Sequence, residues 1–108
     1  MGTPHYLSPE IIKEIPYSFK TDIWSLGVLL YEICSLQPPF SGLNLVRLTQ
    51  RISRGKYVSI PDHFSKDLKS LIKSMLRTEV KDRVNINQIC RFPLIENKIK
   101  ELTNQEVY

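Results

Sequence analysis

Residues 22–36 have the hydrophobic pattern of a helix that is apolar on every face. One stripe along this helix comprises Ile23, Leu26, Leu30 and Cys34, and the remaining faces carry Trp24, Val28, Leu29, Ile33 and Leu36. A helix of this kind is typically buried and needs neighbours on all sides. Thr21 is the expected N-cap, Asp22 adds favourable negative charge at the helix start, and Gln37-Pro38-Pro39 ends the helix.

Two further segments show the helical period with one apolar stripe. Residues 44–54 direct Leu45, Leu48 and Ile52 inward and stop at Gly55, which favours the left-handed conformation of a helix end. Residues 66–77 form an amphipathic helix behind the N-cap Ser65, and their apolar positions recur at helical spacing: Leu68, Leu71, Ile72, Met75 and Leu76.

The C-terminal segment predicts two short helices. Asn85 caps the first, with Gln88 in the capping-box position, and Phe92-Pro93 interrupts it. The second covers about 94–103 and is expected to bury Ile95, Ile99 and Leu102. Near the N-terminus, three prolines predict an irregular loop with at most one short helix, at Pro9–Lys13. No segment alternates with period two, so the predicted fold class is mainly α.

Length and charge restrict the classes of function. The chain has 108 residues, which is enough for at most one domain. Its net charge is +4. Its basic residues are interleaved with acidic ones, so nucleic-acid binding is not expected. The two cysteines, Cys34 and Cys90, lie in apolar helical patterns and are expected to be buried, reduced thiols of an intracellular protein, cytoplasmic or nuclear/cytoskeletal. No signal peptide is visible, and the longest apolar run is too short to span a bilayer, so no membrane partner is expected.

Three pieces of sequence carry a family resemblance. The strings Gly2-Thr3-Pro4-His5-Tyr6-Leu7-Ser8-Pro9-Glu10 and Asp22-Ile23-Trp24-Ser25-Leu26-Gly27, followed by Arg83, resemble the second half of a eukaryotic Ser/Thr protein kinase domain. Residues 52–61 add an Ile-x-x-Gly-Lys-Tyr-x-x-Ile-Pro rhythm that is similar to NIMA-related kinases. The resemblance implies a partial C-terminal (large) lobe over residues 1–95, from the end of the activation segment onward, and a C-terminal helical tail over residues 96–108.

The resemblance also implies roles for the first string. Thr3 would hydrogen-bond the catalytic aspartate of another loop and so orient it toward a protein Ser/Thr hydroxyl. The substrate-binding residues would be Gly2, Thr3, Pro4, Tyr6 and Leu7. Without the resemblance, the sequence is also consistent with a purely structural role, in which the Thr3 hydroxyl only stabilises a proline-bounded turn.

Two further positions have structural roles in the kinase family. The family pairs the glutamate of its Ala-Pro-Glu motif, here Glu10, with a distant arginine, for which Arg83 is the candidate. The alternative is that these are two unrelated surface charges. Asp22 matches an aspartate that accepts N–H bonds from the catalytic loop. Without that loop it would be either a plain helix-start anion or a buried acceptor without donors.

The elements that bind nucleotide are not in this sequence. It has no Gly-x-Gly-x-x-Gly loop, no Val-Ala-x-Lys strand, no His-Arg-Asp loop and no Asp-Phe-Gly. We therefore expect the chain to have no catalytic residue, no metal site and no cofactor of its own, with ATP and Mg bound only in an intact enzyme that includes the missing N-terminal part. Alone it is expected to be inactive. The alternative is a non-catalytic interaction module; a helical DNA-binding domain is disfavoured.

Overall fold

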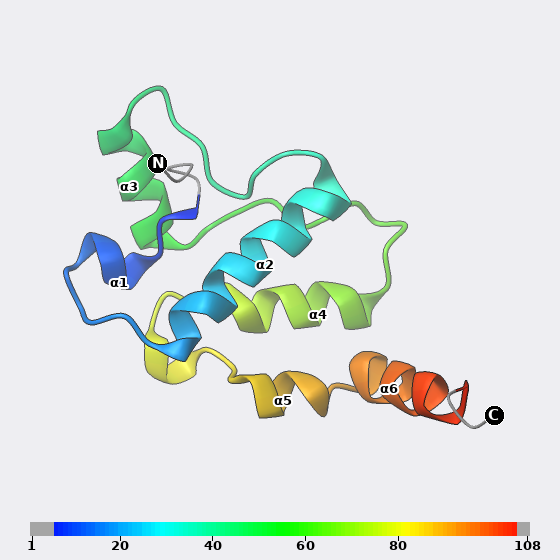
Figure 1. The fold of residues 1–108 in the computed structure, drawn as a ribbon. Helices are drawn as coiled ribbons and strands as arrows, with labels where there is room; N and C mark the ends of the chain where they lie inside the picture. Colours follow the sequence, from blue (N-terminus) through cyan, green and yellow to red (C-terminus); the bar gives the residue numbers. More distant parts are fainter. Residues whose placement is uncertain (1–5, 106–108) are drawn as a thin grey trace.

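The computed structural model describes residues 6–105, and these fold into helices without a strand among them (Figure 1). The elements are α1 (Pro9–Ile12), α2 (Phe19–Ser35), α3 (Leu45–Arg54), α4 (Lys66–Met75), the 3-10 turn η2 (Val80–Asp82), α5 (Ile86–Cys90) and α6 (Pro93–Gln105). The prediction of a mainly α fold is confirmed.

The start of α2 differs from the sequence prediction. The extended residue Ser18 is its N-cap, and the helix begins at Phe19. Thr21 lies within the first turn, where its Oγ1 accepts a hydrogen bond from the Ser18 N–H at 3.1 Å. The prediction of Thr21 as N-cap was therefore wrong. Serine and threonine are both good caps, and here the earlier of the two begins the helix.

The predicted caps of the other helices agree with the structure, although α4 ends at Met75, two residues earlier than predicted, and α6 runs from Pro93 to Gln105. Ser65 accepts a hydrogen bond from the Leu68 N–H, and Asn85 and Gln88 form the expected capping box. Gly55 adopts a φ of 68° after α3, as the left-handed stop requires. The Ser65 and Asn85 side chains and the Gly55 backbone N–H satisfy unpaired backbone groups of their own helices, so local sequence is sufficient to place these ends.

The core forms where α2 crosses α4. The α2 side chains Trp24, Val28 and Tyr31 pack with Ile72 and Leu76 of α4, and this cluster is completed by Phe40, Leu48, Ile52 and Ile60. The Trp24 ring is fully buried and stacks on Phe40, with 5.6 Å between ring centroids. A second, smaller cluster joins α2 and α4 to α5 through Ile23, Leu71, Met75 and Ile89.

One face of α2 has no cover among the described residues. Its apolar side chains are spaced at helical intervals and expose 44–88% of their surface: Phe19, Leu26, Leu29, Ile33 and Leu36. We call these five residues the α2 stripe. Because its sequence is apolar on every face, α2 was predicted to be buried on all sides. This prediction is wrong for the residues that the structure describes. Leu29 is exposed, whereas Trp24 is fully buried.

The end of α6 is also more exposed than predicted. Ile95 is half-buried, but Ile99 and Leu102 expose 45% and 49% of their surface. Figure 1 shows α6 running past α4, so that among residues 6–105 no other helix covers its later turns. The prediction that Ile99 and Leu102 are buried was wrong because helical spacing identifies an apolar face but not what covers it.

The close approach of α2 and α4 provides a test of the core. A Cβ added at Gly27 would lie 2.9 Å from Met75 Cβ and 3.0 Å from a Leu76 methyl. We expect Gly27→Ala to lower the free energy of unfolding by roughly 1–3 kcal/mol because the helices must separate. Helix propensity alone predicts the opposite sign, a gain of about 1 kcal/mol. Urea unfolding followed by circular dichroism measures the difference.

The matched control is Ile33→Ala, on the exposed face of the same helix. It should change the free energy of unfolding by less than about 0.5 kcal/mol. A Gly27→Ala protein as stable as the original would show that α2 and α4 do not approach this closely.

Candidate functional site

The first predicted site string lies partly outside the described residues, which begin at Tyr6. Gly2, Thr3 and Pro4 belong to the undescribed part. The half-buried Tyr6 donates a hydrogen bond from its hydroxyl to Glu32 Oε2 at 2.8 Å. This bond, together with burial and the negative charge of Glu32, raises the pKa of Tyr6. Leu7 is half-buried and packs against the cluster around Trp24.

The next three residues turn the loop into α1. The Ser8 hydroxyl accepts a hydrogen bond from the Ile11 N–H at 3.3 Å, and Pro9 occupies the first helical position, which suits its fixed φ. Glu10 follows within the first turn, and only 1% of its surface is exposed. The local sequence thus directs a carboxylate into the protein at the end of the loop.

Arg83 lies against this carboxylate although it is 73 residues away in sequence. Its Nη1 is 2.7 Å from Glu10 Oε2 and its Nη2 is 2.9 Å from Glu10 Oε1, so the two side chains form a bidentate pair. Both side chains are fully buried. The alternative of two unrelated surface charges is excluded by this geometry.

The remaining polar atoms of the pair are also satisfied. Arg83 donates to the carbonyl oxygens of Lys20 at 2.7 Å and Arg77 at 2.9 Å, and its guanidinium carbon lies 5.1 Å from the centre of the Trp24 ring. The Thr21 hydroxyl donates to Glu10 Oε2 at 2.9 Å. The pair therefore joins the end of the loop, the first turn of α2 and the segment after α4.

The charge state of Glu10 depends on these bonds. Burial alone would raise the pKa of its carboxyl group. Hydrogen bonds from Arg83, from its own backbone N–H and from Thr21, together with the positive charge of Arg83, outweigh burial and hold the pKa below its usual value. The carboxylate form is thus the one that the fold stabilises.

Asp22 has an exposed side chain in the first turn of α2. It accepts a hydrogen bond from the Tyr17 hydroxyl, which raises the pKa of Tyr17. Of the two alternatives left open by the sequence, the structure shows the helix-start anion and not the buried acceptor.

Sequence reasoning missed three partners of the buried pair. Thr21 was interpreted as a cap, whereas its hydroxyl bonds Glu10. A polar residue at a buried position of an otherwise apolar helix was the available signal. The carbonyl groups of Lys20 and Arg77 carry no signal in the sequence, because every residue has a backbone carbonyl.

Comparison with known proteins decides the family. The family model described as "Protein kinase domain" matches residues 1–95, which is most of the chain. The chain belongs to the protein kinase family. Its helical structure is that of part of the C-terminal lobe, and the glutamate and arginine of the buried pair both lie within the matched region.

Several relatives of this kinase chain are named Ser/Thr kinases of the Nek, or NIMA-related, group. It is 46% identical to human serine/threonine-protein kinase Nek5 over 107 residues, which is 99% of the chain and 15% of Nek5. It is 48% identical over 96 residues to probable serine/threonine-protein kinase nek3 of Dictyostelium discoideum (88% and 8%), and 42% identical over 101 residues to mouse Nek2 (94% and 23%). The chain thus spans less than a quarter of each of these three relatives.

Protein kinases use ATP with magnesium. Within residues 6–105 of this kinase chain, no three side chains of the acidic, histidine or cysteine type are grouped to hold a metal ion. In the same residues no helix is long and apolar enough to cross a membrane. Cys34 and Cys90 are free and half-buried, which is less burial than predicted.

Removing one partner of the buried pair should destabilise the kinase chain strongly. We expect Glu10→Gln to lower the free energy of unfolding by roughly 3–5 kcal/mol, because Arg83 is left as an unpaired buried charge. Urea unfolding measures the loss. If the single variant does not fold, the double variant Glu10→Gln/Arg83→Met, which removes both charges, should regain part of the lost stability.

The matched control is Glu101→Gln, which removes a carboxylate that is exposed and 3.4 Å from Lys98 Nζ. It should cost less than about 1 kcal/mol. Equal losses for Glu10→Gln and Glu101→Gln would contradict a structural role for the buried pair.

The lowered pKa of Glu10 makes part of the stability depend on pH. The unfolded chain binds a proton at this group near the ordinary glutamate pKa of about 4.3, and the folded chain binds it only at lower pH. The stabilisation is therefore fully present above that value and is lost as the pH falls through the folded pKa. The difference in unfolding free energy between the original chain and Glu10→Gln should narrow over this acidic range. If the difference in unfolding free energy stayed constant between about pH 6 and about pH 2, that result would contradict a lowered pKa of Glu10 in the folded chain.

Proposed function

We propose that this chain is the substrate-side loop and helical base of a NIMA-related Ser/Thr protein kinase. The parent enzyme would transfer the ATP γ-phosphate to Ser and Thr hydroxyls of protein substrates. Family membership and the similarity to Nek kinases support this proposal, since each of the relatives described above is named a Ser/Thr kinase. ATP as the phosphate donor and free cysteines support an intracellular location, in the cytoplasm, nucleus or cytoskeleton.

The observation that carries the proposal is the exposed α2 stripe. Its five apolar side chains lie on one face of a helix whose opposite face is the centre of the core. A contiguous apolar face of this length is unfavourable in water and typically marks a contact surface. The relatives are several times longer than this chain, so further parts of a catalytic domain are available to cover it. We infer that these parts carry the ATP and magnesium sites.

Within this proposal each part of the chain has a role. Residues 1–95 are the partial kinase domain, and residues 96–108 are a C-terminal tail, in which α6 continues beyond the family match as far as Gln105. Thr3 positions the catalytic aspartate supplied by the parent enzyme, and Asp22 accepts hydrogen bonds from its catalytic loop. The substrate-side loop comprises Gly2, Thr3, Pro4, Tyr6 and Leu7. The buried pair holds the end of this loop on α2.

A non-catalytic interaction module is the second candidate. The observation in its favour is that the core is closed around Trp24, which has 0% exposed surface, so the chain has a packed interior of its own. In that case a partner protein, and not the rest of a kinase domain, would cover the α2 stripe. A transplant into an active enzyme distinguishes the two candidates.

We expect residues 1–108 to support catalysis when they replace the matching segment of human Nek5, measured as ATP-dependent phosphorylation of a generic Ser/Thr substrate protein. The 108-residue chain alone should give no phosphorylation and no ATP binding by calorimetry. Thr3→Ala in the transplant should lower kcat by roughly 10- to 100-fold, because the catalytic aspartate loses its orientation.

The matched control is Thr103→Ala, in the exposed last turns of α6, which should leave kcat unchanged. A folded but inactive transplant would favour the interaction module. Phosphorylation by the isolated chain that disappears on Thr3→Ala would contradict the proposal that its catalytic residues lie elsewhere.

A further inference from the structure

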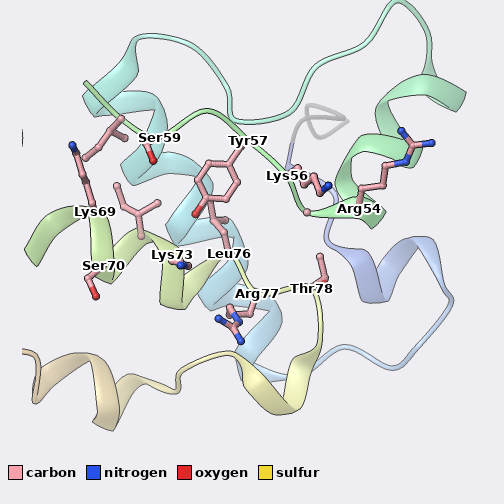
Figure 2. A pocket seen from close by; sticks show the side chains of 13 residues that line it. Arg54, Lys56, Tyr57, Ser59, Lys69, Ser70, Lys73, Leu76, Arg77 and Thr78 are labelled. Atoms are coloured by element: carbon pink, nitrogen blue, oxygen red, sulfur yellow. The ribbon is translucent and has the colours of Figure 1, made fainter. Parts of the chain in front are cut away.

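A cavity of about 750 Å³ lies between the end of α3 and one face of α4 (Figure 2). Five of the residues that line it are basic: Arg54, Lys56, Lys69, Lys73 and Arg77. None of the lining residues is an aspartate or a glutamate. The cavity is distinct from the buried pair and from the α2 stripe.

Two features of the backbone gather these charges. Lys69 and Lys73 are four residues apart and therefore lie on one side of α4, and Arg77 follows just after the helix ends at Met75. Opposite them, α3 ends at Arg54, and Gly55 turns the chain through a left-handed conformation that leads into Lys56. Figure 2 shows the two groups on either side of the cavity.

Few of these charges are neutralised within the part of the chain that the structure describes. Lys69 pairs with Asp62 at 3.1 Å, and that carboxylate is fully exposed. No ion pair of residues 6–105 involves Arg54, Lys56, Lys73 or Arg77. Lys69 and Lys73 are four apart on α4, where like charges repel each other modestly, and an anion in the cavity would offset this repulsion.

The floor of the cavity is apolar. Ile60, Ile72 and Leu76 line it and expose only 2–3% of their surface. A second cavity of about 430 Å³ shares Arg54, Lys56 and Tyr57 with the first and adds Arg51. We call the two together the basic groove. It follows residues 54–60 and offers both cations and an apolar surface along an extended stretch.

We propose that the basic groove binds an acidic peptide segment of a partner protein, with carboxylate or phosphate side chains on the cations and an apolar side chain on the floor. Charge complementarity selects an anion. A recess between two helices admits an extended chain, whereas a bilayer surface is too broad to enter it. The apolar floor favours a peptide over nucleic acid, whose affinity comes mainly from phosphate contacts.

Fluorescence anisotropy of the 108-residue chain with three labelled peptides tests the proposal. The first peptide alternates Glu with Leu, the second has phosphoserine at the Glu positions, and the third has Gln there. We expect the first or the second to bind, and more weakly as salt is raised, whereas the Gln peptide does not bind. The relative affinity of the first two peptides identifies carboxylate or phosphate as the preferred anion.

Two double variants remove the same net charge from different surfaces. Lys73→Gln/Arg77→Gln, in the groove, should weaken binding by roughly tenfold or more. Lys13→Gln/Arg47→Gln removes one lysine and one arginine that line neither cavity and should leave the affinity within about twofold. All four side chains are exposed, and circular dichroism checks that both variants keep the original fold.

Three outcomes would overturn the proposal. Equal weakening by the two double variants would mean that only the net charge attracts the peptide. Binding of the Gln peptide as tight as that of the acidic ones would mean that the cations have no role. Binding of phosphatidylserine vesicles that the groove variant abolishes, without binding of either acidic peptide, would assign the surface to a membrane.

Discussion

The Glu10–Arg83 pair is the interaction on which the arrangement of this chain depends. Burying two opposite charges is costly unless they are well hydrogen-bonded, and here every side-chain nitrogen and oxygen of the pair has a partner. The guanidinium bonds the carboxylate with two nitrogens and also reaches two backbone carbonyls. The Arg83 side chain thus connects the end of the loop, the first turn of α2 and the segment after α4.

This pair also explains how an irregular loop is attached to a helical body. The loop has little secondary structure beyond the four residues of α1. Its end is fixed because Glu10 and Thr21 share a hydrogen bond and Arg83 closes over both Glu10 and the Trp24 ring. If the chain serves as the substrate side of a kinase, as we propose, this attachment sets the position of the loop relative to the helices that carry it.

The exposed surfaces of the chain separate into two kinds. The α2 stripe is apolar and its spacing is that of a helix face, which suits a permanent contact with other parts of a catalytic domain. The basic groove combines charge with a small apolar floor, which suits a partner that binds and leaves. None of the five residues of the α2 stripe lines either cavity of the basic groove.

Sequence by itself determined the family, the helical class and most helix ends, because caps and apolar periodicity are local properties. It also pointed to Glu10 and Arg83, through motif resemblance. Only the tertiary structure decided that Thr21 bonds Glu10 and that one face of α2 is left open. The tertiary structure also brings basic residues together in one cavity, although they are interleaved with acidic residues along the chain. These features depend on which faces meet in space, and the spacing of residues within one helix carries no information about its neighbours.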